Sequence, residues 1–147
     1  MGEDMSFVCR LLMQAESSGL IPKALYHYRQ SDSSVSKTIS EENVRQMSAN
    51  VCQIQDAIRL SNYAYLEQPY LDFLKLNVKL PLLISSKVED YRKWYSWWPE
   101  SNASASKNKA LPARTRFIQG AAAHKLWPIM KVYDFLLNKV YYGIIYR

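Results

Sequence analysis

The feature that most constrains the fold of this chain is a repeat of apolar residues at steps of three and four. It is clearest in one long segment, where the repeating residues are Val44, Met47, Val51, Ile54 and Ile58. Such steps place side chains on one face of an α-helix, whereas a half-buried strand needs strict alternation. Similar spacing recurs in most other segments, so we expect a mainly α protein.

Charge is unevenly distributed along the 147 residues. The formal net charge is +6, but residues 1–86 sum to −1 and residues 87–147 sum to +7. The basic part also contains all four Trp residues. A basic surface rich in Trp and Tyr is typical of proteins that bind an anionic membrane or a nucleic acid. The basic residues form no dense stripe or known nucleic-acid motif, so we expect no nucleic-acid partner.

The two cysteines, Cys9 and Cys52, lie on separate predicted helices without the spacing of metal ligands. We expect two buried reduced thiols rather than a disulfide. The sequence shows no signal-peptide pattern and no charge-free apolar run of about 18 residues. These observations predict a cytoplasmic location without a transmembrane segment.

An acidic pair, Glu3 and Asp4, opens the first predicted helix, which spans residues 4–18 and ends before Gly19. Its predicted buried stripe consists of Met5, Val8, Leu11, Leu12 and Ala15. Carboxylates at a helix N-terminus accept hydrogen bonds from backbone N–H groups and oppose the helix dipole. Capping alone would explain the acidic pair, and a catalytic role is the alternative.

A Tyr-rich segment follows, and its alternation predicts a short strand at residues 24–30. This strand ends near Arg29, and a loop rich in hydroxyl groups follows it, with Ser34 and Ser36 near its end. The planar fork of an arginine suits phosphate oxygens, so the loop is placed to bind an anion. A solvated loop without a ligand is the plainer interpretation.

In this order, the three motifs resemble the end of the catalytic domain of family 2 glycosyltransferases, which are inverting enzymes of the GT-A fold. The matching segments are Gly2-Glu3-Asp4-Met5-Ser6-Phe7, Ala24-Leu25-Tyr26-His27-Tyr28-Arg29 and Ser34-Val35-Ser36. The resemblance implies that residues 1–38 form the C-terminal edge of a GT-A α/β domain, with one helix and one short strand. A helical extension of about five helices would follow.

The resemblance also implies roles for individual residues. Asp4 would be the catalytic base that takes a proton from the acceptor hydroxyl, and Glu3 would position the acceptor or orient Asp4. Arg29 would face the diphosphate or the acceptor, while Ser34 and Ser36 would line the loop over the donor. The implied partners are a nucleotide-sugar donor and a saccharide or lipid-linked acceptor.

Two departures from the family pattern limit the resemblance. Many members carry a His two residues after the Tyr-Arg pair, where this chain has Ser31. Members also bind the nucleotide on upstream strands and hold Mg²⁺ or Mn²⁺ with an Asp-x-Asp turn, which this sequence lacks. We therefore expect the C-terminal piece of a glycosyltransferase (a hexosyltransferase) of the bacterial surface-polysaccharide type, inactive alone and without its own metal site. The rest of the enzyme would cover the first helix and strand, so we expect an exposed apolar patch there.

The remaining chain is predicted to be helical. One long helix is expected from a cap at Thr38–Ser40 to about Leu66, and its apolar stripe favours core packing over a coiled-coil partner. Two more helices are expected at 69–81 and 86–98, and the second is unusually aromatic. These aromatic side chains indicate either packing inside the bundle or one end at a membrane interface.

Residues 100–111 lack periodicity and predict a mobile linker between the helical extension at 39–99 and basic amphipathic helices at 112–147. Pro128 is placed to begin the last helix, which has a wide apolar face. Two interpretations of this face stay open, namely docking on the preceding helices and lying in the plane of an anionic bilayer. The second would place the protein peripherally at the inner face of the cell membrane. A non-catalytic helical interaction or membrane-docking module is the alternative to the glycosyltransferase hypothesis.

Overall fold

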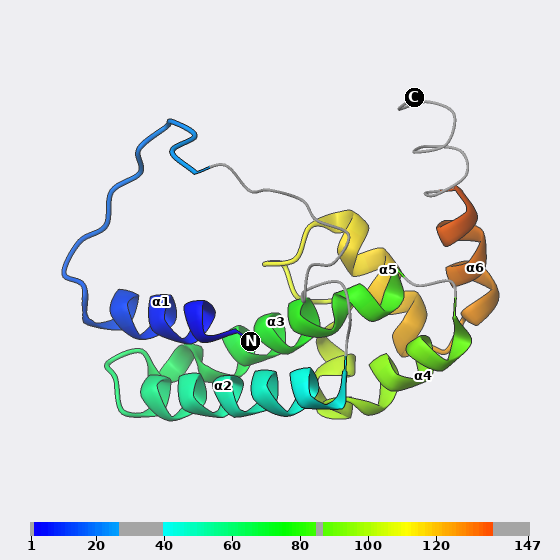
Figure 1. Cartoon of the computed structure of the whole chain (residues 1–147), viewed down its shortest axis with the longest axis horizontal. Coiled ribbons are helices and arrows are strands. Elements are labelled where there is room, and N and C mark those ends of the chain that lie inside the picture. Colours follow the sequence, from blue (N-terminus) through cyan, green and yellow to red (C-terminus); the bar gives the residue numbers. More distant parts are fainter. Residues whose placement is uncertain (1, 27–39, 85–86, 137–147) are drawn as a thin grey trace. The chain divides into compact units, whose positions relative to one another are not determined.

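The computed structural model describes residues 2–26, 40–84 and 87–136 (Figure 1). The described residues are mainly α-helical and contain no β-strand, which confirms the mainly α prediction. Residues 24–26 have no regular secondary structure, and the rest of the strand predicted at 24–30 lies outside the described residues. Contacts divide the chain into two compact units, residues 1–67 and 68–147.

The first unit pairs α1 (Glu3–Gln14) with α2 (Glu41–Arg59), and a short 3-10 helix, η2 (Ala64–Leu66), follows. α2 begins as predicted, because the Ser40 hydroxyl accepts a hydrogen bond from the Asn43 N–H at 3.1 Å. The predicted end at Leu66 is wrong. The Ser61 hydroxyl donates to the Ile58 carbonyl at 2.8 Å and accepts from the Tyr63 N–H at 3.1 Å, so local side-chain bonds replace the helical pattern.

α1 packs on α2 through a different face from the one predicted. Ser6 and Cys9 are buried, and the Ser6 hydroxyl lies 3.4 Å from Oε1 of Gln53 on α2. The predicted stripe is largely exposed, with Val8, Leu11 and Leu12 each about half accessible. Apolar residues occupy more than one side of this helix, so periodicity alone could not identify the side that meets α2.

Two smaller predictions for this unit are also wrong. α1 ends at Gln14 rather than near residue 18, because Ala15 is extended and the Ser-Ser-Gly run behind it has low helix propensity. The two cysteines are both free, as expected, but they differ in burial. Cys9 is buried against α2, whereas Cys52 is exposed on the surface of α2.

Gly2 sets the approach of the α1 N-terminus to α2. Its φ of 84° lies in the left-handed region, which residues with a Cβ atom adopt at a cost. A Cβ atom at this position would clash with Sδ of Met47 on α2. Its carbonyl accepts the hydrogen bond from the Ser6 N–H at 3.1 Å. The backbone conformation of Gly2 and its close approach to α2 therefore explain why a glycine precedes the acidic pair.

The second unit is organised around α5. Its elements are α3 (Glu67–Lys79), η3 (Leu80–Leu83), α4 (Val88–Ser96), η4 (Pro99–Ser104), α5 (Ala113–Ala123) and α6 (Trp127–Phe135). α5 contacts η3, α4, η4 and α6. Small residues permit this central position, since a Cβ atom on Gly120 would come within 3.2 Å of Ser106 Cβ. The buried Gln119 donates to the Leu76 carbonyl on α3 at 2.8 Å.

The linker predicted at 100–111 is instead ordered in part and joined to α3. Pro99–Ser104 form η4, and Ser101 and Asn102 are buried. Three α3 side chains on one helical face bind three η4 residues. The pairs are Asp72–Ser104 at 2.5 Å, Lys75–Glu100 at 2.7 Å and Lys79–Asn102 at 2.5 Å. A segment without periodicity is ordered here because side chains far away in the sequence bind its polar groups.

The other predicted elements of the second unit agree more closely with the structure. α3 ends at Lys79 just before Pro81, α5 follows Pro112, and Pro128 lies in the first turn of α6. The aromatic helix ends at Ser96 rather than Trp98, because Trp97 is extended, and Trp98 then adopts a left-handed conformation at φ 53°. Tyr91 and Trp94 are fully buried, so most of its aromatic mass packs inside this unit.

We predict that Gly2→Ala destabilises the first unit by about 1–2 kcal/mol, because alanine must adopt a left-handed φ. Urea unfolding followed by circular dichroism measures the change. Gly19→Ala is the matched control, since a Cβ atom there meets nothing within 4 Å. It should change the free energy of unfolding by less than about 0.5 kcal/mol. Equal effects of the two substitutions would contradict the role given to Gly2.

Candidate functional site

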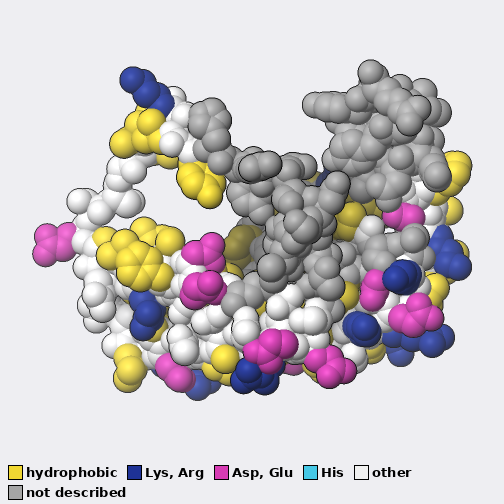
Figure 2. Space-filling view, in the orientation of Figure 1, with side chains coloured by type: hydrophobic (Ala, Val, Ile, Leu, Met, Phe, Trp, Pro, Cys, Tyr) yellow, Lys and Arg dark blue, Asp and Glu magenta, His cyan; other side chains and the backbone are white. Residues whose placement is uncertain are grey.

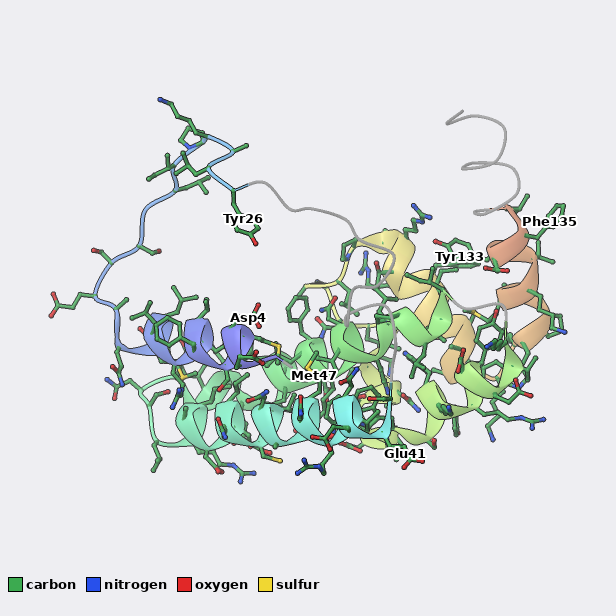
Figure 3. All side chains as sticks on the ribbon, in the orientation of Figure 1. Asp4, Tyr26, Glu41, Met47, Tyr133 and Phe135 are labelled. Carbon is green, nitrogen blue, oxygen red and sulfur yellow. The ribbon has the colours of Figure 1, made fainter. Side chains whose placement is uncertain are left out.

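The two carboxylates at the start of α1 are exposed to solvent. Oδ1 of Asp4 accepts a hydrogen bond from the Met5 N–H at 2.8 Å. The pKa of Glu3 is lowered, chiefly because its own backbone N–H donates to the carboxylate. Figure 3 shows the Asp4 side chain on the side of α1 that faces away from α2. The site therefore presents two acidic groups that can bind a cation or accept a proton from a hydroxyl group.

The other predicted site residues, Arg29, Ser34 and Ser36, lie outside the described residues. The structure therefore does not test whether they approach Asp4, and their grouping with Glu3 and Asp4 stays a prediction. A surface pocket of the first unit lies at the opposite end of α1, where Arg10 and Gln14 face Leu60 and Asn62. The acidic pair does not line this pocket.

An exposed apolar surface runs along α1 beside the acidic pair. It consists of Phe7, Val8, Leu11 and Leu12, whose exposed fractions are 60%, 48%, 53% and 53%. We call this surface the α1 apolar face. Figure 2 shows it as a hydrophobic cluster over α1 with acidic side chains at one end. The segment behind the helix is also apolar and exposed, with Leu20, Ile21, Leu25 and Tyr26 between 64% and 92% accessible. The apolar patch expected on this part of the chain is present.

A metal site was not expected in the chain itself. Among the residues that the structure describes, no three His, Cys, Asp or Glu side chains lie close enough together to hold a metal ion. The Asp-x-Asp turn that would hold Mg²⁺ or Mn²⁺ in a complete enzyme is not in this sequence. The metal expected for the complete enzyme therefore stays a prediction.

The most unusual ionisable group in the structure is one that the sequence did not reveal. Lys79 is completely buried in the second unit. Its Nζ donates to the carbonyls of Trp97 and Trp98 at 2.9 and 3.2 Å and to Oδ1 of Asn102 at 2.5 Å, and lies 4.3 Å from the centre of the Trp94 ring. Burial lowers the pKa of Lys79 from 10.5 to about 7, and the carboxylate of Glu100 partly opposes this shift.

A lysine with a pKa near 7 is often catalytic, but the surroundings of Lys79 favour a structural role. All three of its N–H groups have acceptors, and no part of the side chain is accessible to a substrate. One sequence signal was available. Asp72, Lys75 and Lys79 share one face of α3 at steps of three and four, which is the spacing of side chains that meet one partner.

Comparison of the chain with models of protein families, with curated proteins and with solved structures gives no match. The resemblance to family 2 glycosyltransferases therefore stays a prediction from the three motifs.

We predict that Lys79→Met destabilises the second unit by about 2–4 kcal/mol at pH 7, because two partly buried carbonyls and one buried amide oxygen lose their donor. Lys75→Met is the matched control on the same face of α3. The Lys75–Glu100 ion pair has a 51% exposed carboxylate, so its loss should cost less than about 1 kcal/mol. Thermal or urea unfolding of both variants measures the difference. A cost for Lys79→Met no larger than that for Lys75→Met would contradict this prediction.

A comparison of wild type with Lys79→Met tests the lowered pKa of Lys79. Between pH 7 and 10.5 the unfolded chain keeps a proton on Lys79 that the folded protein has released, so this group makes the free energy of unfolding rise with pH. Lys79→Met lacks this contribution. We expect the stability difference between wild type and variant to grow by on the order of 1–2 kcal/mol from pH 7 to pH 9. A difference that stays constant would show that Lys79 remains protonated.

Proposed function

We propose that this chain is the C-terminal part of a nucleotide-sugar-dependent inverting glycosyltransferase that works in the cytoplasm in the synthesis of cell-surface polysaccharide. The observation that carries the proposal is the environment of α1. The first turn of α1 contains the exposed acidic pair of the family motif, and the exposed α1 apolar face runs along the same helix. The described residues contain no helix long and apolar enough to cross a membrane.

A helix with apolar residues on two sides is typical of a helix between two layers. One side of α1 is covered by α2 through Ser6 and Cys9. The α1 apolar face has no cover from the described residues, although burying four such side chains is worth several kcal/mol. The proposal assigns this face to the nucleotide-binding half of the enzyme. The exposed segment at 20–26 would then be the start of an edge strand on the same half.

In the proposed reaction, Asp4 accepts the proton of the acceptor hydroxyl while the hydroxyl oxygen attacks the anomeric carbon of the donor sugar. The bond to the nucleoside diphosphate breaks on the opposite side, which inverts the anomeric configuration. Glu3 orients the acceptor or Asp4, Arg29 binds phosphate oxygens by its planar fork, and Ser34 and Ser36 line the donor loop. The divalent cation would be bound by residues outside this chain and would neutralise charge on the leaving group.

We predict that Asp4→Asn in the complete enzyme lowers turnover by about 10²–10⁴-fold with donor affinity unchanged. Asparagine keeps a side-chain oxygen that can accept the Met5 N–H, so α1 should stay folded while the base is lost. The coding DNA upstream of the Met1 codon identifies the complete chain to express. Product formation is then measured with a panel of nucleotide sugars, and donor affinity by calorimetry.

Glu16→Gln is the matched control, because Glu16 is exposed just beyond α1 and outside the motif. It should leave turnover unchanged. Full turnover in the Asp4→Asn enzyme would overturn the base assignment. A stop codon and ribosome-binding site directly upstream of Met1 would overturn the enzyme proposal itself and favour a non-catalytic helical module.

A further inference from the structure

α6 packs through one side and presents apolar side chains on the other. Met130 is completely buried, whereas Ile129, Val132, Phe135 and Leu136 are between 39% and 58% exposed. At about 100° per residue, these four residues span a sector of about 120° whose centre lies almost opposite Met130. We call this sector the α6 apolar face. It is an amphipathic arrangement turned outward, away from the core of its own unit.

Cationic side chains lie along both borders of the α6 apolar face. Lys131 follows it on one side and is exposed. Tyr133 lies on the other side, where Nε of Arg114 from α5 donates to its hydroxyl at 2.6 Å and the guanidinium lies 5.4 Å from the ring centre. Figure 3 shows Tyr133 and Phe135 leaving α6 on opposite sides. Asp134 falls on the Met130 side of the helix, away from the apolar sector.

The second unit as a whole is positively charged, like the two borders of the α6 apolar face. Residues 68–147 sum to +8, while residues 1–67 sum to −2. Between residues 112 and 136 there are four Lys and Arg residues and one acidic residue. A partner that covers the α6 apolar face must therefore accept apolar side chains in its centre and positive charge at its edges.

We propose that the α6 apolar face inserts into the headgroup region of an anionic membrane, with Lys131 and Arg114 beside lipid phosphates. A helix with apolar side chains on one face and cations at its borders has the composition that binds such a surface. A second copy of the chain fits less well. Its cations would face like charges across a two-fold axis, and four side chains are small against the roughly 800 Å² per partner of a stable interface. The proposal does not depend on the glycosyltransferase proposal.

The first test is sedimentation of the full chain with vesicles of phosphatidylcholine, with or without phosphatidylglycerol. We expect binding to be at least about tenfold tighter to the anionic vesicles and to weaken as salt is raised. Equal binding to both vesicles, or no binding to either, would overturn the proposal. A lack of binding to either vesicle is also the result expected if another part of the chain covers the α6 apolar face.

Paired substitutions locate the contact on α6. Val132→Ser with Phe135→Ser should lower affinity for anionic vesicles at least about tenfold, and Lys131→Glu at least about fivefold. The matched controls are Leu60→Ser with Tyr65→Ser, which are exposed in the first unit, and Lys109→Glu, an exposed lysine of the second unit away from α6. The controls should bind like wild type. Equal losses in controls and α6 variants would overturn the assignment to this face.

Sedimentation velocity without lipid tests the remaining alternative, in which a second copy of the chain covers the α6 apolar face. We expect wild type and the Val132→Ser, Phe135→Ser variant to have the same monomeric mass, with matching circular dichroism spectra. A wild-type dimer that the double substitution converts to a monomer would show that a second copy covers the α6 apolar face, and would overturn the membrane proposal.

Discussion

The buried amine of Lys79 organises the polar interior of the second unit. It joins α3 to the end of α4 through the carbonyls of Trp97 and Trp98, and to η4 through Asn102, whose amide also donates to the Tyr95 carbonyl at 2.9 Å. Trp98 has a left-handed backbone conformation, which surrounding interactions must stabilise. A buried charge is costly unless every donor is matched, so the position of three acceptors around one amine defines how these segments meet.

In each unit an amphipathic helix has an apolar face that the described residues leave exposed, and the charges beside the two faces differ in sign. The α1 apolar face lies next to Glu3 and Asp4, whereas the α6 apolar face lies between Lys131 and Arg114. Apolar surfaces of this kind mark interaction sites, and the neighbouring charge selects the partner. We therefore assign the two surfaces to different partners, a further protein layer for α1 and an anionic lipid surface for α6.

Sequence reasoning succeeded where a single local interaction decides the structure. The Ser40 cap, the Pro residues near the helix ends and the helical periodicity of α2 each act within one or two turns, so neighbouring residues are enough to predict them. It failed for α1, where apolar residues at several angles left the buried side undetermined. It also failed for η4, because the order of that segment depends on α3 side chains more than 20 residues away.

The candidate site shows the same division between features that short segments determine and features that depend on tertiary contacts. The sequence by itself determined that an acidic pair opens a helix and that the chain is mainly α, because caps, dipoles and periodicity are properties of short segments. The tertiary structure alone decided that Ser6 and Cys9 meet α2, that the α1 and α6 apolar faces point outward, and that Lys79 is buried among oxygen acceptors. Burial and pKa depend on which segments come together in space, and that information is spread over the whole chain.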